Sequence, residues 1–349
     1  METKLHDGIS LCMIVRDEAL CIERGLAAAR PHVDQIIVVD TGSSDNTREL
    51  AEPFTDILKH FTWIDDFSAA RNYSLQFASQ QWTLVLDADE ILSEQDYRQL
   101  RQLTHTQSTD GYYLTQRRYL VNAPDNDPRW KPVKVPDRFS KDYTAYTENA
   151  ILRFFRNTSA IRYSGRIHEI VDEAIMADRT ANTNIIIHHY HENPENDTEQ
   201  HVRRNLRIQE ILISSGKATA RDYLSAGSAH LANTQRFDKA EEYLSKALEM
   251  GADAGETLEA LAITHYKNGR LQQATAIYQN LYESGRGSTS VLNNLSNLLI
   301  KAGDLQGSAR LLEQLLSLDI ENPTRKERIQ QNLNAIRHAI AEQQSSSDQ

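Results

Sequence analysis

Short apolar runs that end in acidic residues dominate the first part of the chain. They lie at residues 9–15, 35–39 and 82–86 and lead into Arg16-Asp17-Glu18, Asp40-Thr-Gly-Ser-Ser-Asp45 and Asp87-Ala-Asp-Glu90. Strands that are apolar throughout and separated by helical segments indicate a parallel sheet covered on both faces. Such sheets bind ligands outside the carboxyl ends of their strands. The pattern predicts an α/β fold with a Rossmann-like, mostly parallel sheet, helices on both faces, and one crevice where the acidic residues meet.

Asp87 and Asp89 stand one residue apart after the third apolar run. On an extended strand both side chains would project to the same side, because side chains alternate. Both carboxylates would then reach one Mn²⁺ or Mg²⁺ ion, with substrate phosphates completing its shell. Acidic pairs are also common on solvated loops, but a position directly after an apolar strand favours a metal site for a nucleotide diphosphate.

A 34-residue repeat organises the second half of the chain. This interval separates Leu224, Leu258 and Leu292, and likewise Ala240, Ala274 and Ser308. Small residues at fixed positions allow helices to approach closely, and large apolar residues fill the gaps between them. A helix–turn–helix unit of this length is typical of tetratricopeptide repeats. The spacing predicts an all-α repeat domain over residues 217–342, capped by a terminal helix from about Thr324 to Glu342.

Three further segments complete the domain prediction, in which residues 1–197 form the α/β domain. The apolar positions of Thr198–Ser215 predict a connecting helix within residues 198–216, which Gly216 ends. The Ser- and Gln-rich residues 343–349 are predicted to be a disordered tail. Within the first domain, residues 122–146 contain four prolines and should form no long regular element. Residues 117–141 carry seven Lys and Arg against three Asp, which predicts either a cover for a phosphate or acceptor or a solvated surface loop.

Composition narrows the class of protein. Of 349 residues, 40% are hydrophobic and 25% are charged, as in ordinary globular proteins. A formal net charge of −11 argues against nucleic-acid binding. There is no apolar run long enough for a transmembrane segment, and residues 1–7 lack the character of a signal peptide. With Cys12 and Cys21 as the two cysteines, we expect a reduced, cytoplasmic protein.

Several ordered motifs resemble the family 2 glycosyltransferases with a GT-A fold. They are residues 9–18, 39–47, 67–72 and 86–91. Residues 153–157 and 165–169 are similar to the branch of this family that is fused to C-terminal tetratricopeptide repeats. The resemblance spans about residues 8–192 and implies an inverting transfer of a sugar from a nucleotide sugar, usually a UDP-sugar.

The resemblance also implies roles for individual residues. Asp40 would accept a hydrogen bond from the uracil, and Arg71 would lie against the base or ribose. Asp89 would ligate the metal directly, while Asp87 would face the ribose or a metal-bound water as part of the same motif. A divalent ion would neutralise charge on the leaving diphosphate. The nucleotide pocket would be lined by Val15, Arg16, Glu18 and Ala88.

Two further roles follow from the resemblance. An inverting displacement requires a general base, which the family usually supplies as Asp or Glu downstream of the metal motif. Glu169, next to His168, is the preferred candidate, with Asp172 and Glu173 as alternatives. In related enzymes a histidine near the end of the catalytic domain completes the metal shell. His189 matches best, although this chain has His191 where the family often has Gly.

Each candidate also has a structural interpretation. Asp40 would simply begin a turn, and Asp45 would cap the following helix. Arg71 would pair with a surface carboxylate, Asp65 or Asp66, and Glu169 would be a half-buried ion-pair partner. The histidines at 188–191 would form a hydrogen-bonded polar strand end.

Together these patterns favour a metal-dependent inverting glycosyltransferase. The acceptor would be a peptide or protein, modified at Ser, Thr or Cys and presented by the repeats, because such repeats usually bind peptides in a concave groove. An alternative is a transferase for cell-surface polysaccharide or lipopolysaccharide. A non-catalytic tetratricopeptide scaffold is disfavoured by the intact Asp40, Arg71, Asp87 and Asp89. A nucleotidyltransferase is disfavoured because no Gly-rich loop follows the first strand.

Overall fold

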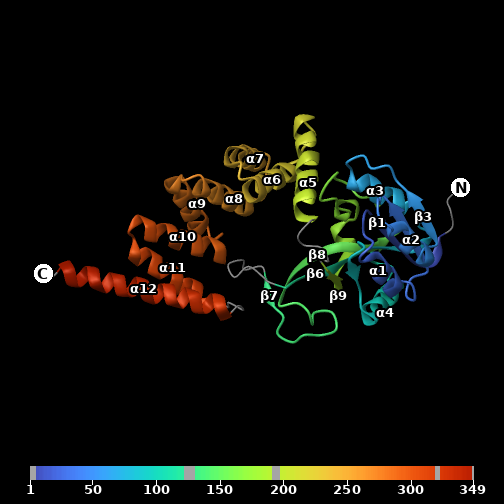
Figure 1. Ribbon diagram of the computed structural model, residues 1–349, viewed down its shortest axis with the longest axis horizontal. Helices are drawn as coiled ribbons and strands as arrows, with labels where there is room; N and C mark the ends of the chain where they lie inside the picture. Colours follow the sequence, from blue (N-terminus) through green and yellow to red (C-terminus); the bar gives the residue numbers. More distant parts are fainter. Residues whose placement is uncertain (1–4, 122–129, 191–196, 319–322, 348–349) are drawn as a thin grey trace. The chain divides into compact units, whose positions relative to one another are not determined.

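The computed structural model describes residues 5–121, 130–190, 197–318 and 323–347 (Figure 1). Two compact units divide the chain, and their main boundary falls between Asp197 and Thr198. The strands up to residue 190 are β1 (His6–Val15), β2 (Gln35–Asp40), β3 (Ile57–His60), β4 (Gln80–Val85), β5 (Glu90–Ile91), β6 (Gly111–Leu120), β7 (Lys131–Pro132), β8 (Ala145–Arg156) and β9 (Thr180–His189). The helices are α1 (Ile22–Ala29), α2 (Thr47–Ala51), α3 (Phe67–Leu75) and α4 (Glu94–Leu103), with short 3₁₀ turns at Glu52–Phe54, Asp172–Ala174 and Ala177–Arg179.

One mixed sheet with the order β3-β2-β1-β4-β8-β6-β9-β5 forms the centre of the first unit, and β7 pairs with β8. The four strands from β3 to β4 are mutually parallel, and three of them, β1, β2 and β4, correspond to the predicted apolar runs. β8 joins β4 antiparallel and β6 joins β8 antiparallel, whereas β9 runs parallel to β6. The mostly parallel, GT-A-like sheet predicted from the sequence is therefore confirmed.

Both faces of this sheet are covered because the side chains of its apolar strands divide between two cores. On β1, Leu11 and Met13 pack with Leu26 of α1 and Leu100 of α4. Cys12 points to the opposite face, where it packs with Leu75 of α3 and apolar residues between 161 and 175. This two-sided burial explains why the strands contain almost no polar positions.

Strands β6 and β8 form a long antiparallel pair that the apolar runs did not predict. Their exposed ends carry polar residues, including Arg117 of β6 opposite Glu148 of β8. Among the described residues 130–144, the only regular element is the two-residue strand β7, in keeping with the prolines. The connecting helix is α5 (Asp197–Ser214), and none of the described helices combines the length and hydropathy of a membrane-spanning segment.

Antiparallel helices build the second unit and follow one another from yellow to red in Figure 1. They are α6 (Ala220–Ala229), the π-helical turn His230–Thr234, α7 (Phe237–Glu249), α8 (Ala254–Lys267), α9 (Leu271–Glu283), α10 (Thr289–Ala302), α11 (Leu305–Ser317) and α12 (Pro323–Ser347). Ala240, Ala274 and Ser308 are fully buried at the repeated small position. The region fits tetratricopeptide repeats. α12 continues to Ser347, so the disordered tail predicted from residue 343 is wrong for the described residues.

The turn inside each helix pair contains a residue in the left-handed conformation. Gly269 and Gly303 have φ of 76° and 85°. The equivalent residue one repeat earlier is Gln235, with φ of 53°. A side chain in this conformation costs about 1–2 kcal/mol, which makes Gln235 a strained position in the first repeat.

Replacement of Gln235 by Gly is expected to stabilise the protein. The relief of strain exceeds the roughly 0.5–1 kcal/mol of extra chain entropy that glycine loses on folding, so the free energy of unfolding should rise by about 0.5–1 kcal/mol. Urea denaturation followed by circular dichroism measures the change. The matched control, Gly269→Gln, should destabilise by a similar amount. Equal or lower stability of the Gln235→Gly variant would contradict the strain.

Candidate active site

The acidic motif after β4 lies in a turn rather than on an extended strand. β4 ends at Val85, and the backbone N–H of Glu90 donates to the carbonyl of Asp87 at 3.1 Å. The predicted same-side projection of Asp87 and Asp89 from a strand is therefore wrong. Strand alternation ends before Asp87, and the two carboxylates have different partners.

Asp87 is bound by two arginines. Its Oδ1 accepts from Nη2 of Arg71 on α3 at 2.8 Å, and its Oδ2 accepts from Nη2 of Arg153 on β8 at 3.0 Å. Burial alone would raise the pKa of Asp87, but the charges of Arg71 and Arg153 outweigh it and hold that pKa well below its usual range. The Asp87 carboxylate is therefore anchored by two positive charges that favour its ionised form.

Arg71 joins the acidic turn to the proposed base. Its Nε donates to Oε1 of Glu169 at 2.6 Å, across 98 residues of sequence. Arg71 is 5% exposed, and its Nη1 is buried without a hydrogen-bond partner. Burial alone would lower the pKa of Arg71, but Asp87 and Glu169 hold it above its usual value. The alternative in which Arg71 pairs with Asp65 or Asp66 is wrong, since it pairs with Asp87 and Glu169.

Asp89 faces His189 at the end of β9. Oδ2 of Asp89 and Nε2 of His189 lie 3.0 Å apart, and the backbone N–H of Tyr190 donates to the carbonyl of Asp89. Burial alone would lower the pKa of His189, but the hydrogen bond and charge of Asp89 raise it above the ordinary value. The pairing of β5 with β9 sets Glu90 opposite His189. This pairing keeps the neighbouring Asp89 side chain next to that of His189.

The donor set suits a divalent ion with two protein ligands. Among the described residues there is no group of three or more His, Cys, Asp and Glu side chains that could hold a metal ion. A carboxylate and an imidazole in contact, Asp89 and His189, nevertheless match sites in which substrate phosphates complete the shell. The residues therefore fit an ion that binds together with a diphosphate.

His188 has a structural role. It is 4% exposed, its Nδ1 lies 2.7 Å from the Tyr119 hydroxyl, and its ring stacks on Phe139 at 3.8 Å between centroids. Burial lowers the pKa of His188 to about 4. The interpretation of a hydrogen-bonded histidine is therefore confirmed for His188, whereas His191 lies outside the described residues.

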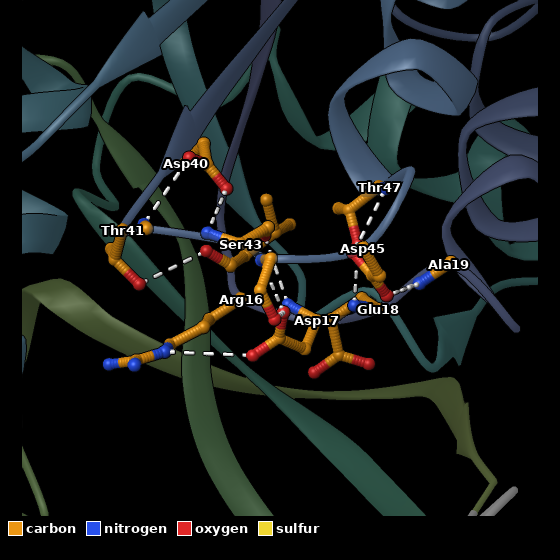
Figure 2. Close-up of polar contacts among 12 residues, drawn as sticks. Arg16, Asp17, Glu18, Ala19, Asp40, Thr41, Ser43, Asp45 and Thr47 are labelled. Atoms are coloured by element: carbon orange, nitrogen blue, oxygen red, sulfur yellow. Dashed lines mark hydrogen bonds and ion pairs between the residues drawn. The ribbon is translucent and has the colours of Figure 1, made fainter.

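The loops that follow β1 and β2 carry the other predicted nucleotide contacts and are joined to each other by hydrogen bonds (Figure 2). The backbone N–H groups of Asp17, Glu18 and Ala19 donate to Ser43 Oγ, Thr47 Oγ1 and Asp45 Oδ2 respectively. The Val15 carbonyl accepts from the N–H and hydroxyl of Thr41. Arg16 Nε lies 3.7 Å from Asp17 Oδ2 in an exposed ion pair, and 48% of the Arg16 side chain is exposed. Arg16 is therefore far more open to an anionic ligand than Arg71, whose side chain is 7% exposed.

Asp40 is buried and holds its own turn. Its Oδ1 accepts from the Ser43 N–H at 3.0 Å, and its Oδ2 accepts from the Gly42 N–H at 3.2 Å and lies 3.5 Å from His60 Nδ1. The structural interpretation of Asp40 is thus confirmed, and its role toward uracil stays a prediction. Each carboxylate oxygen can accept more than one hydrogen bond, so Asp40 can still accept one from a ligand.

The residues near Glu169 differ in their contacts. His168 is exposed with φ of 53°, directly before Glu169 in a loop closed by the Ser164–Ile170 bridge. Asp172 accepts from the Tyr113 hydroxyl at 2.9 Å. Of these acidic residues, Glu169 is the one bound to Arg71, which links it to the acidic turn.

Sequence reasoning missed three residues of this site. Arg153 lies within the motif at residues 153–157, from which no individual role was predicted. Tyr163 is buried with its hydroxyl unpartnered, and its ring lies 5.6 Å from the Arg71 guanidinium. Glu90 accepts from the Asp87 N–H at 2.9 Å, and burial together with the charge of Asp87 raises its pKa. The position of Glu90 directly after Asp87 and Asp89 in the acidic motif could have indicated that it belongs to the site.

Gly25 of α1 allows the acidic turn to approach the helix. A Cβ at Gly25 would lie 2.8 Å from the carbonyl oxygen of Ala88, which is itself buried. The Gly25→Ala variant should displace the turn and lower the free energy of unfolding by about 1–3 kcal/mol, despite the better helix propensity of alanine. UDP binding should weaken with it, as calorimetry would measure. Ala27→Ser, on the exposed side of α1, is the control. A Gly25→Ala protein that is more stable and binds UDP normally would contradict this role.

The sheet and its acidic turn define an α/β domain of the GT-A type, followed by a helical repeat unit. Residues 10–165 match the sequence model of the family "Glycosyl transferase family 2". The chain thus carries a family 2 glycosyltransferase domain.

Curated relatives share part of the chain. A TPR repeat-containing protein of Synechococcus elongatus is 37% identical over 170 residues, which are 48% of this chain and 36% of that protein. The SPbeta prophage-derived glycosyltransferase SunS of Bacillus subtilis is 24% identical over 212 residues, which are 59% of this chain and 45% of that protein. The chain therefore spans less than half the length of either relative. The solved structure of S. aureus TarS 1-349 in complex with UDP-GlcNAc shares 12% identity at a TM-score of 0.45, covering 79% of this chain and 92% of that chain.

Proposed function

We propose that this protein is a metal-dependent, inverting glycosyltransferase that moves a sugar from a UDP-sugar to a peptide or protein acceptor. The observation that carries the proposal is the meeting of Asp87, Asp89, Arg71, Glu169 and His189 beside the carboxyl end of β4. These side chains come from four separate segments of the chain, and Arg71, Asp87 and Asp89 lie within the residues that match the family 2 glycosyltransferase model. A drifted, non-catalytic scaffold would have no reason to keep these contacts.

The donor would bind across the carboxyl ends of β1, β2 and β4. Asp40 would accept from the uracil imide, and the loop of Val15, Arg16 and Glu18 would line the nucleotide together with Ala88. Asp89 and His189 would hold Mn²⁺ or Mg²⁺, and a bound ion supplies charge neutralisation for the leaving diphosphate. The exposed guanidinium of Arg16 adds positive charge in an otherwise acidic loop.

Glu169 would serve as the general base, with His168 beside it. Its carboxylate would take the proton of the acceptor hydroxyl while the acceptor oxygen bonds to the anomeric carbon and the bond to UDP breaks. Arg71 holds Glu169 through Oε1, which leaves Oε2 for the acceptor proton. A cysteine acceptor would depend less on the base, because a thiol ionises near pH 8.5.

The helical repeats would present the acceptor. Stacked repeats of this kind form extended surfaces for peptides, and the chain's net charge of −11 supports a partner other than nucleic acid. The proposal includes a cytoplasmic location, which the buried free thiols of Cys12 and Cys21 support.

A panel of UDP-sugars with Mn²⁺ tests the proposal. Slow release of UDP from one donor, lost on chelation and restored by Mn²⁺, is the expected result. No release and no metal-dependent binding of UDP would favour the scaffold instead. Labelled sugar from the active donor, offered with a cell extract, should enter protease-sensitive material. Label in a protease-resistant polymer would move the acceptor to a surface polysaccharide.

A further inference from the structure

Both oxygens of Asp87 are held by guanidinium groups from different elements. Arg71 on α3 occupies Oδ1 at 2.8 Å, and Arg153 on β8 occupies Oδ2 at 3.0 Å. The arginine side chains are only 7% and 13% exposed, whereas that of Asp87 is 34% exposed. Two nearly buried cations therefore converge on one carboxylate that opens toward solvent.

The two arginines depend on this carboxylate. Arg71 also forms an ion pair with Glu169. Among the described residues, Arg153 forms its ion pair with Asp87. Burial and the charge of Arg71 both act to lower the pKa of Arg153, but the charge of Asp87 holds that pKa above its usual value. Withdrawing Asp87 would leave two buried cations facing each other, and breaking a buried ion pair in this way is strongly destabilising.

The backbone of Asp87 is held as firmly as its side chain. Its N–H donates to Oε2 of Glu90 at 2.9 Å, and its carbonyl accepts from the Glu90 N–H at 3.1 Å. Asp87 is therefore held through both carboxylate oxygens and both backbone groups. If the Asp87 side chain moved toward an ion, both ion pairs would break, and the hydrogen-bonded backbone would not move with it.

Asp89 is held differently. Within the described residues its carboxylate has one polar contact, that of Oδ2 with Nε2 of His189 at 3.0 Å. The partner is an imidazole, which is itself a common metal ligand. An ion could therefore enter between Asp89 and His189 without exposing a buried charge.

We propose that Arg153 is a positioning residue of the donor site, which together with Arg71 keeps Asp87 out of the metal shell and fixes it toward the donor. Asp89 and His189 are then the protein ligands of the ion, and the donor's diphosphate completes the shell. This inference rests on the proposed function, which already assigns the ion to Asp89 and His189, and adds to it Arg153 as the residue that holds Asp87 in place together with Arg71. Asp87 binds two cations of the protein, and Asp89 binds the cation that arrives with the donor.

Metal and nucleotide binding, measured separately, test the inference. Electron paramagnetic resonance of Mn²⁺ with UDP present should show normal Mn²⁺ affinity in Asp87→Asn and a loss of about tenfold or more in Asp89→Asn. In Arg153→Gln, calorimetry should show UDP binding weakened about tenfold at saturating Mn²⁺, with Mn²⁺ affinity unchanged. Arg153→Lys should restore most of the UDP binding, because Arg153 contacts Asp87 through a single nitrogen.

The possible results distinguish a failure of this inference from a failure of the proposed function. Equal loss of Mn²⁺ affinity in Asp87→Asn and Asp89→Asn would make Asp87 a metal ligand and overturn the inference alone. Normal UDP binding by Arg153→Gln, or no rescue by Arg153→Lys, would do the same. A wild-type protein without Mn²⁺-dependent UDP binding would overturn the proposed function as well. Circular dichroism checks folding, and the two Arg153 variants decide the question if Asp87→Asn does not fold.

Discussion

Replacement of Asp89 by Ala is expected to abolish metal-dependent UDP binding and to reduce sugar transfer by about a thousandfold. A metal that stabilises charge on a leaving group contributes several kcal/mol, and about 4 kcal/mol corresponds to this factor. The variant should fold normally, because Asp89 loses a single side-chain contact, that with His189. Calorimetry with UDP, with and without Mn²⁺, measures the binding, and release of UDP from the donor measures the reaction.

The exposed Asp7 provides the matched control in the same domain. Asp7→Ala removes the same charge at a distance from the acidic turn in sequence and should leave UDP binding unchanged. If Asp89→Ala bound UDP with wild-type affinity and metal dependence, the assignment of Asp89 to the ion would be wrong. If both variants lost binding equally, the effect would be one of overall charge.

Replacement of Arg71 by Lys is expected to impair both stability and activity. Removing one partner of a buried ion pair costs about 3–5 kcal/mol. Lysine keeps the charge but lacks the planar fork that reaches Asp87 and Glu169 together, so the loss in free energy of unfolding should be roughly 2 kcal/mol. Displacement of the base and of the acidic turn should lower kcat/KM by about a hundredfold. Thermal unfolding and donor kinetics measure the two effects.

Arg48 of α2 is exposed and serves as the control for this substitution. Arg48→Lys should change neither the free energy of unfolding nor kcat/KM. An Arg71→Lys protein with wild-type kcat/KM would show that the ion pairs with Asp87 and Glu169 are not required for the reaction. A protein that lost stability but kept its activity would assign Arg71 a purely structural role.

The strands were predictable where burial on both faces left no polar positions. The runs at 9–15, 35–39 and 82–86 became β1, β2 and β4, because a strand covered on both sides must be apolar at every residue. β6 and β8 were not predicted in this way, because each contains a run of polar and charged residues, Gln116-Arg-Arg118 in β6 and Thr147-Glu-Asn149 in β8. The repeats were predictable because one helix pair recurs every 34 residues with its small and large side chains in register.

The acidic motif shows the limit of local reasoning within the site. The residue pattern placed Asp87 and Asp89 on the same side of a strand, and the family resemblance gave them different roles, but the local motif identified none of their protein partners. Their partners, Arg71, Arg153 and His189, lie 16, 66 and 100 residues away in pairings that only the packed sheet creates. Spacing along a strand carries no information about such pairings.

The amino-acid sequence by itself determined the parallel α/β core, the repeat unit and the residue types of a site for a metal and a nucleotide diphosphate. The core and the site residues follow from patterns and motifs within a few residues, and the repeat unit follows from the regular 34-residue interval. Only the tertiary structure decided that the turn after β4 splits its two aspartates between an arginine pair and a histidine, and that Arg71 bridges the turn to Glu169. Burial removes these charges from water, so each must find a counter-charge nearby, and the fold rather than the local sequence selects which one.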